Sequence, residues 1–534
     1  MIYDGGCATI VPPAPNSSPM SKNLSRQLRF IKDPVRSHGG VIAAQNQQAA
    51  DVGAAVLAAG GNAVDAAIAT AFALAALEPW MSGLGGSGFM VVWDAHQKRG
   101  HIVDFGTISA KKLDPAHYPL TGRVAADLFA WPEVADNRNL LGYSAISVPG
   151  QPDGMRTAHE RFATRPWAEL LGPAVELAEA GMEPDWFTTL IVATAASDLA
   201  RFPASRDWFL PGGFPPAPEW TGPARRLKNA ALARTLRAVR DRGARDIYEG
   251  TLAKALVADL AAGGSAIDGA DLANYRARVV EPLEIAHAGR RLLVPGGLTA
   301  GPTLADALSR LEGRLGASAD AAAFVAYAEA LAAANAIRLE TMGESRTKAE
   351  CTTHLSVIDR DGNMVALTQT LLTLFGSKVT LPETGILMNN GINWFDPRPG
   401  KPNSIGARKR PLSNMLPVLG LKGDAPWLAI GASGGRRIPP AVFQLISFQA
   451  DFGLDLETAF HQPRIDTSIV GEVAVNPRLA PEIKAALARR FTLVEREPTP
   501  YPLGFACPSA VAIENSERVG MTETAQPWAG AAAG

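Results

Sequence analysis

The sequence has few cysteines and no excess of charge of either sign. Its three cysteines, Cys7, Cys351 and Cys507, are far apart and odd in number, which argues against a disulfide framework and against a CxxC metal site. Lys and Arg number 51 and Asp and Glu number 52, so the formal net charge is −1. No basic surplus is available to neutralise a phosphate backbone, and we expect no nucleic-acid partner.

Long hydrophobic runs are also absent. The longest, residues 66–77, is shorter than the roughly 20 residues that span a bilayer, and no basic amphipathic stretch is typical of a membrane anchor. The N-terminus lacks the charged and apolar regions of a secretory signal, and its Pro and Ser content predicts a disordered leader over residues 1–37. Met20 is an alternative start. We therefore expect a cytoplasmic protein without membrane association.

The composition is that of a globular chain, with 47% hydrophobic and 19% charged residues. Its 534 residues predict two structural units or one large two-lobed unit. Near the N-terminus, residues 47–59 predict a helix that stops at two glycines. Asn62 then caps an apolar, buried helix that runs to Glu78.

A glycine-rich stretch, residues 82–88, follows that helix. Such a stretch can cradle phosphate, but no Lys-Ser/Thr pair follows it, and it leads into a strand, residues 89–93, rather than a helix. A tight turn with close backbone approach is the favoured interpretation. Residues 150–290 are expected to be mostly helical, and residues 321–342 form a long Ala-rich helix.

The pattern changes to β after Glu350. Residues 354–359 and 364–371 alternate on either side of an Asp-Gly turn, which predicts a β-hairpin. A turn centred on Asp361 and Gly362 places Thr352 opposite Thr370 or Leu371. Thr368 then shares one face of the second strand with Thr370.

A threonine hydroxyl needs an adjacent base to act as a nucleophile. No GxSxG elbow is present, and His354 is the only histidine near these threonines. A backbone break before Thr352 would free an α-amine of pKa about 8, which could accept the hydroxyl proton. The residues alone leave two simpler interpretations open, in which two threonines start a strand and His354 is an ordinary strand histidine.

Residues 352–359, followed by Asp361-Gly362-Asn363, resemble the segment that opens the small subunit of gamma-glutamyltransferases. Further motifs of that family follow in the expected order across residues 40–450. They lie at residues 60–67, 78–79, 82–86, 148–150, 248–250, 271–275, 385–390, 410–413 and 431–435.

The resemblance implies an α+β protein with the four-layer αββα sandwich of N-terminal nucleophile hydrolases. It implies self-cleavage between Cys351 and Thr352, which would give a large subunit, 38–351, and a small subunit, 352–534, from one precursor. A dimer of such heterodimers stays open. No metal and no organic cofactor is implied, because neither cleavage nor acyl transfer needs one.

Carried over position by position, the resemblance makes Thr352 both nucleophile and, through its α-amine, base. Thr370 matches a threonine that hydrogen-bonds the nucleophile and assists processing, and Thr368 matches another on the same strand. Gly434 and Gly435 match the oxyanion-hole pair. Ser413 matches a serine that holds the substrate carboxylate.

The departures from the family concern recognition of an amino-acid headgroup. In the family an Arg-Glu pair follows the strand after the glycine-rich stretch and its arginine binds the substrate carboxylate, whereas this chain has Asp-Phe-Gly-Thr at residues 104–107. A family asparagine is replaced by Leu372. The polar residues that would bind an amino group are altered within residues 391–395. We consider four residues as replacements: Asn393, Asn414, Arg436 and Arg437.

The sequence thus predicts an amidohydrolase that forms an acyl-enzyme on Thr352. Its expected substrate is a small carboxylate-bearing amide, either a gamma-glutamyl compound such as glutathione or a variant such as an oxamate or glutaryl amide. A non-catalytic binding protein that never matures is the alternative from another class.

Overall fold

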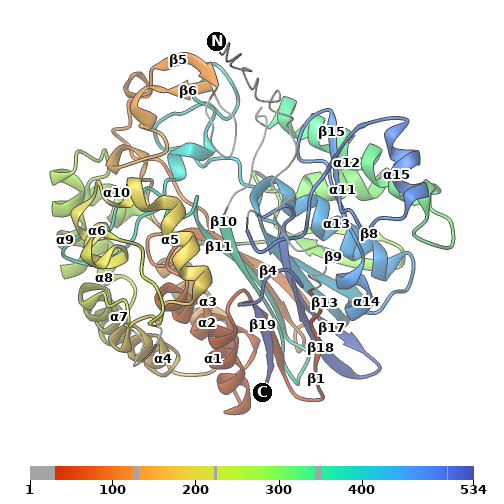
Figure 1. The fold of residues 1–534 in the computed structure, drawn as a ribbon. Coiled ribbons are helices and arrows are strands. Elements are labelled where there is room, and N and C mark those ends of the chain that lie inside the picture. Colours follow the sequence, from red (N-terminus) through yellow and green to blue (C-terminus); the bar gives the residue numbers. More distant parts are fainter. Residues whose placement is uncertain (1–29, 125–131, 220, 222–224, 343–350, 502) are drawn as a thin grey trace, which may run out of the picture.

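The structure, a computed structural model, describes all residues except 1–29, 125–131, 220, 222–224, 343–350 and 502. Two seven-stranded antiparallel sheets lie face to face between two groups of helices (Figure 1). We call the sheet that contains Thr352 the first sheet. Its strands in spatial order are β19 (Gly530–Ala533), β2 (Val41–Ala44), β10 (Cys351–Ile358), β11 (Met364–Leu372), β3 (Ser87–Asp94), β4 (Arg99–Phe105) and β7 (Arg278–Val280).

The second sheet contains the other long strands. They are, in spatial order, β1 (Val35–Ser37), β18 (Glu517–Thr522), β17 (Cys507–Glu514), β13 (Ala425–Ser433), β12 (Val418–Lys422), β9 (Arg290–Val294) and β8 (Leu283–His287). Two small sheets lie outside the sandwich. They consist of β5 (Leu120–Val124) with β6 (Pro132–Val134), and β14 (Ile465–Asp466) with β15 (Glu472–Val475) and β16 (Thr492–Glu495).

One helical layer covers the outer face of the first sheet. It comprises α1 (Gln47–Ala58), α2 (Ala63–Leu77), α3 (Gln151–Phe162), α4 (Trp167–Ala180), α5 (Trp186–Leu199), α6 (Pro203–Phe209), α7 (Ala230–Arg242), α8 (Asp246–Glu249), α9 (Thr251–Ala262) and α10 (Gly269–Asn274). The other layer covers the second sheet with α11 (Gly301–Ser309), α12 (Ala321–Thr341), α13 (Ile438–Ala450), α14 (Leu456–His461) and α15 (Pro481–Ala488).

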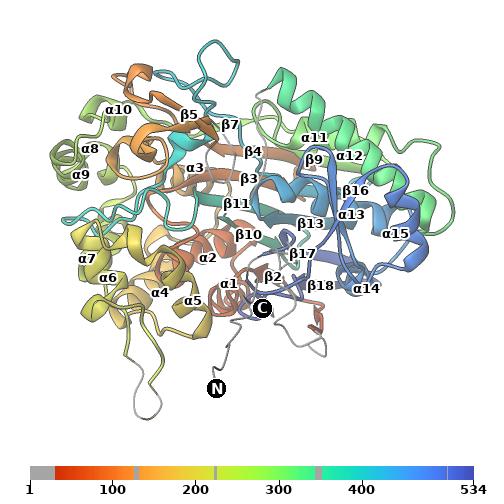
Figure 2. The ribbon, with the colours of Figure 1, turned by 45° about the horizontal axis from the view of Figure 1, so that its top comes forward.

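Three apolar clusters fill the spaces between these four layers, because strand side chains alternate between the two faces of a sheet. In β10, Leu355 and Val357 pack toward α2, whereas Ile358 packs between the sheets. Figure 2 shows the neighbouring strands of the first sheet and, facing them, those of the second sheet. The sequence correctly predicted the αββα sandwich.

Helix α2 forms as predicted. Every one of its residues is buried, and Asn62 and Asp65 make a reciprocal capping box at its start. The Asp359 carboxylate, in the hairpin between β10 and β11, accepts the N–H of Ala63 at 3.0 Å and those of Asp361 and Asn363 at 2.9 Å. The hairpin is therefore fixed to the start of α2.

The glycine-rich stretch before β3 makes the close backbone approach expected of it. A Cβ at Gly86 would lie 2.6 Å from the carbonyl oxygen of Thr370, and one at Gly88 would lie 2.2 Å from that of Thr368. The expected leader boundary at residue 37 is wrong. Strand β1 pairs with β18, and the Lys32 ammonium donates to Thr522 Oγ1 at 2.8 Å, so residues 30–37 are part of the fold.

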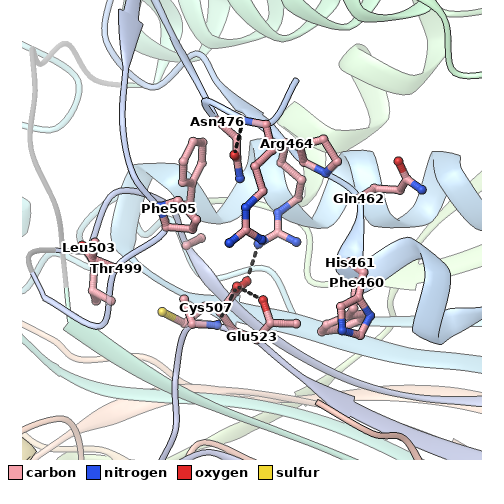
Figure 3. Close-up of a pocket in the computed structure, with 16 residues that line it drawn as sticks. Phe460, His461, Gln462, Arg464, Asn476, Thr499, Leu503, Phe505, Cys507 and Glu523 are labelled. Atoms are coloured by element: carbon pink, nitrogen blue, oxygen red, sulfur yellow. Dashed lines mark hydrogen bonds and ion pairs between the residues drawn. The ribbon is translucent and has the colours of Figure 1, made fainter. Parts of the chain in front are cut away.

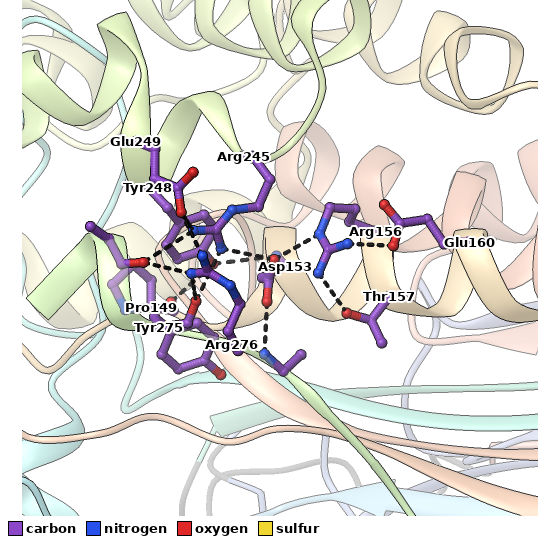
Figure 4. A network of polar contacts seen from close by, with 12 residues as sticks. Pro149, Asp153, Arg156, Thr157, Glu160, Arg245, Tyr248, Glu249, Tyr275 and Arg276 are labelled. Carbon is purple, nitrogen blue, oxygen red and sulfur yellow. Dashed lines mark hydrogen bonds and ion pairs between the residues drawn. The ribbon is translucent and has the colours of Figure 1, made fainter.

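A buried polar network holds the loop after β4 (Figure 4). The Asp153 carboxylate accepts from Arg156 Nε at 2.8 Å, from Arg245 Nη1 at 3.0 Å and from the N–H of Ala277 at 2.7 Å. Tyr275 stands beside it and donates its hydroxyl to the carbonyl of Gly106 at 2.9 Å. Three of the sequence motifs, at residues 148–150, 248–250 and 271–275, contribute to this network, and Tyr275 links it to Gly106.

Replacement of Asp153 by Asn should destabilise the protein, because Arg156 and Arg245 would lose a buried counter-charge. Removal of one partner from a buried ion pair typically costs about 3 kcal/mol or more. We expect the melting temperature of D153N to fall clearly in thermal denaturation. The matched control is D241N, since Asp241 is half exposed on α7 and pairs with Arg240. Equal melting temperatures for the two variants would show that the network is not a stabilising element.

Candidate active site

Thr352 lies at an irregularity in the pairing of β10 with β11. Cys351 pairs with Leu372 and Thr353 pairs with Gln369, so Thr352 faces Thr370 and Leu371, as the sequence predicted. On the other side of β11, Thr370 pairs with Ser87 of β3. Thr352, Thr370 and Ser87 thus occupy one row across three neighbouring strands. Thr352 is only 2% exposed in the uncut chain.

His354 is a structural residue of the strand. Its Nδ1 lies 2.8 Å from Thr368 Oγ1 and its Nε2 lies 3.0 Å from Ser356 Oγ, so both ring nitrogens have partners. The ring rests on Gly431 of β13, where a Cβ would lie 2.3 Å from His354 Cε1. Burial lowers the pKa of His354 to about 3. A neutral imidazole with both nitrogens engaged favours the strand-histidine interpretation over a general base.

Glu78 lies at the C-terminal end of α2 and contacts the face of β10 that packs on this helix. Sequence reasoning did not single it out as a site residue. Thr353, whose side chain points to the opposite face of β10 from His354, donates its hydroxyl to Glu78 Oε2 at 2.9 Å. Within the described residues, Glu78 Oε1 has no hydrogen-bond partner. Burial raises the pKa of Glu78 to about 8. The available signals were the family motif at residues 78–79 and an acidic residue at the end of a largely apolar helix.

Gly434 and Gly435 lie at the junction of β13 and α13, through the 3-10 turn Gly435–Arg437. Gly434 has a φ of 124°, and a Cβ there would lie 2.9 Å from Ala506 Cα. N–H groups at such a strand-to-helix junction suit an anion. The junction lies near Thr352, because Gln45, the neighbour of β2, donates to Ser433 Oγ at 2.6 Å, and Ala44 pairs with Leu355.

A cavity of about 470 Å³ opens beside the row of hydroxyls. Its polar and charged lining comes from Ser87, Asp104, Thr107, Arg278, Glu281, Thr299, Arg410 and Ser413. Its apolar lining comes from Phe89, Ile102, Val280, Leu298, Trp394 and Met415. Because Ser87 belongs to both the row and the lining, the cavity reaches the row that contains Thr352, although Thr352 and Thr370 are not themselves among its lining residues.

The structure places the other predicted site residues differently. Ser413 lines the cavity, and Trp394, in the altered segment 391–395, lines it as well. Asn414 Oδ1 instead accepts from Arg338 at 3.0 Å, and Asn393 Oδ1 accepts from Asn139 at 2.8 Å. Neither asparagine is among the lining residues of this cavity.

The two arginines after the glycine pair are likewise absent from the cavity lining. Arg437 is buried, donates to the carbonyl of Leu503 and lies 3.7 Å from Asp466. The predicted cleavage position follows Cys351, the first residue of β10, and residues 343–350 lie outside the described residues.

A second, small cavity of about 40 Å³ lies behind the glycine junction (Figure 3). Arg464 and Glu523 form a buried ion pair in it, and Cys507 and Phe505 contribute to its wall. Burial holds the pKa of the Cys507 thiol well above its ordinary value. This cavity has the volume of about one water molecule, so it is too small for an acyl group.

The described part of the chain contains no group of three or more His, Cys, Asp or Glu side chains arranged to hold a metal ion. None of its helices combines the length and apolar character needed to cross a membrane.

Known proteins show the same combination of fold and sequence. The family model for gamma-glutamyltranspeptidase matches residues 49–351 and 342–532. The acylase ACY 1 proenzyme of Pseudomonas sp. (strain SE83) is 33% identical over 508 residues, which cover 88% of this chain and 89% of that protein. The glutathione hydrolase proenzyme of Escherichia coli (strain K12) is 30% identical over 524 residues, which cover 87% and 86%. Cephalosporin acylase from Bacillus halodurans has the same fold, with a TM-score of 0.82 at 24% identity over 97% of this chain and 99% of that chain.

The buried carboxyl of Glu78 should make stability depend on pH. Its pKa is raised from 4.5 to about 8 in the folded protein, so the folded state keeps a proton that the unfolded state loses. Between these pH values the group therefore destabilises the fold by about 1.4 kcal/mol more for each pH unit of increase. E78Q resembles the neutral acid and removes this dependence.

We expect the melting temperature of E78Q, relative to the wild type, to rise as the pH is raised from 5 to 8. The control is E312Q, because Glu312 is exposed and its replacement should leave the curve of the wild type unchanged. Parallel curves for E78Q and the wild type would mean that Glu78 is ionised in the folded state at neutral pH.

Proposed function

The chain belongs to the gamma-glutamyltranspeptidase family of self-processing amidohydrolases, and we propose that its mature form is a threonine acylase for carboxylate-bearing amides. The acyl group that it removes has a terminal carboxylate and no α-amino group, as in a glutaryl amide. The cleaved amide bond would lie at Thr352, and the acyl group would extend into the 470 Å³ cavity.

The apolar wall of the cavity is the observation that supports this substrate class. Leu372, where the family has an asparagine, packs in one cluster with Phe89, Trp394 and Met415, all three of which line the cavity. An ammonium group would lose its hydration against such a wall without compensation. Both carboxylates of the lining are already paired, Asp104 with Arg278 and Arg410, and Glu281 with Arg99. The similarity to the acylase ACY 1 proenzyme supports the same class.

The proposed mechanism uses Thr352 twice. In processing, its Oγ attacks the carbonyl carbon of Cys351, the amide becomes an ester, and water releases the two chains. The freed α-amine, of pKa about 8, then accepts the Oγ proton when Thr352 attacks the substrate amide. The N–H groups of Gly434 and Gly435 stabilise the oxyanion, the amine leaves with the proton, and water hydrolyses the acyl-enzyme.

A gamma-glutamyl substrate such as glutathione is the second candidate. It is favoured by Ser413 in the cavity lining and by the glutathione hydrolase proenzymes among the relatives, at 29% and 30% identity. We further propose a boundary between the large and small subunits at residues 351 and 352, and a cytoplasmic location.

Thr352→Ala should abolish both processing and amidase activity, because one hydroxyl serves both steps. A denaturing gel with intact-mass measurement should show two chains for the wild type and one for the variant. Thr251→Ala is the control, since Thr251 is exposed at the start of α9 and its replacement should leave both properties unchanged. A wild type that stays whole and yet hydrolyses amides would refute this mechanism.

Because the residues that would bind an α-amino group are altered, the enzyme should prefer acyl groups that lack one. We expect the processed enzyme to hydrolyse a glutaryl anilide with a kcat/KM at least about tenfold above that for the gamma-glutamyl anilide, which corresponds to about 1.4 kcal/mol. Release of the chromogenic aniline measures both. The opposite order would establish the gamma-glutamyl reaction as the function.

A further inference from the structure

Three charged residues form one wall of the large cavity. Asp104 and Arg278 are paired residues of the neighbouring strands β4 and β7, and Arg278 Nη2 donates to Asp104 Oδ2. Arg410 reaches the same carboxylate from the segment before β12, and its Nη1 lies 3.1 Å from Asp104 Oδ1. We call Arg278, Asp104 and Arg410 the arginine clamp. All three residues line the cavity.

We propose that the arginine clamp binds the terminal carboxylate of the acyl group and, by its distance from Thr352, selects acyl chains longer than glutaryl. The proposal rests on the proposed acylase function. The two guanidinium groups and one carboxylate of the clamp carry a net charge of +1, and Glu281, the other carboxylate of the lining, is paired with Arg99, so this wall attracts an anion. Each guanidinium has five N–H donors, so both arginines keep donors for a ligand after their contacts with Asp104.

The lack of a side chain at Gly106 leaves room for the Arg410 guanidinium in the cavity wall. Arg410 Nη1 donates to the carbonyl of Gly106 at 2.8 Å, and a Cβ at Gly106 would lie 3.1 Å from the same nitrogen. A side chain longer than glycine at position 106 would therefore compete with the guanidinium for space. Arg410 thus places a cation beside the stretch of residues 104–107, in which the arginine of the family is missing.

The strand register sets the distance between this cation and the nucleophile. Thr352 faces Thr370, Thr370 pairs with Ser87, and the pairing of Gly88 with Phe105 carries the same row on to Gly106. Three strand intervals of about 4.8 Å separate the two ends of the row by about 14 Å.

This distance exceeds what a glutaryl group can bridge. The bond to Thr352 Oγ and one hydrogen bond of about 2.9 Å account for part of the distance of about 14 Å. The remaining length fits a dicarboxylic acyl group of about six to eight carbon atoms. The apolar side chains of Phe89, Trp394 and Met415 lie along the intervening wall, where methylene groups would pack.

The test compares R278Q and R410Q with the wild type on two series of anilides. One series carries glutaryl, adipyl and suberyl groups, and the other carries uncharged alkanoyl groups of the same lengths. For the wild type, adipyl or suberyl should exceed glutaryl in kcat/KM. Each variant should raise KM for the dicarboxylic anilides roughly 10- to 100-fold, the usual effect of a lost charge-assisted contact. For the uncharged series, kcat/KM should stay within roughly threefold of the wild type.

Arg276→Gln is the matched control. Arg276 and Arg278 are two residues apart and each has a side chain that is 53% exposed, but Arg276 pairs with Glu249 and does not line the cavity. R276Q should behave as the wild type on both series. An equal loss on charged and uncharged substrates, or glutaryl as the preferred group, would overturn the proposal. If R410Q does not fold, R278Q decides, because its exposed side chain is dispensable for packing.

A failure of the proposed function can be told apart from a failure of the clamp. If the wild type hydrolyses neither series, the acylase assignment is wrong. Isothermal titration of free suberate into the wild type, R278Q and R276Q then tests the clamp alone. Binding that weakens roughly tenfold or more in R278Q only supports the clamp, and equal binding or no binding in all three proteins rejects it.

Discussion

The register between β10 and β11 is the constraint on which the rest of the site depends. Side chains alternate along a strand, so a slip by one residue would turn Thr352 toward α2 and bring Thr353 to the face between the sheets. Contacts on both faces oppose such a slip. His354 fits only over Gly431, and Thr353 reaches Glu78 only from the opposite face. A third contact, in which the Asp359 carboxylate accepts the N–H of Ala63, holds the hairpin at the start of α2.

Local sequence patterns predicted the parts of the molecule that depend on near neighbours. The capping box at Asn62 and the register that brings Thr352 to Thr370 both follow from spacing within a few residues or within one hairpin. The family resemblance added the sandwich. The cavity could not be predicted in this way, because Arg278 and Arg410 come from separate segments and meet only through Asp104. Asn414 was predicted to bind substrate, but its Oδ1 accepts a hydrogen bond from Arg338.

Leu372 shows how the chain departs from its relatives at a sensitive position. Its φ is 88°, a conformation that asparagine and glycine adopt more readily than a branched apolar side chain. Such a conformation costs of order 1 kcal/mol or more and persists where the surroundings determine it. Here the surroundings are Trp394 and Met415, against which the leucine packs between the sheets. A packed apolar side chain thus stands at the position where the family resemblance implies an asparagine.

The order of strands in the first sheet has a consequence for the two polypeptides of the mature protein. If cleavage occurs before Thr352, as proposed, strands β10 and β11 follow the scission point, yet they lie between β2 and β3, which precede it. In the first sheet the small subunit then contributes β19, β10 and β11, and the large subunit contributes β2, β3, β4 and β7. Strands of the two chains meet along three seams, β19 with β2, β2 with β10 and β11 with β3. Because separation would break the hydrogen bonds of all three seams, we expect the two chains of each molecule to stay together after cleavage without a disulfide.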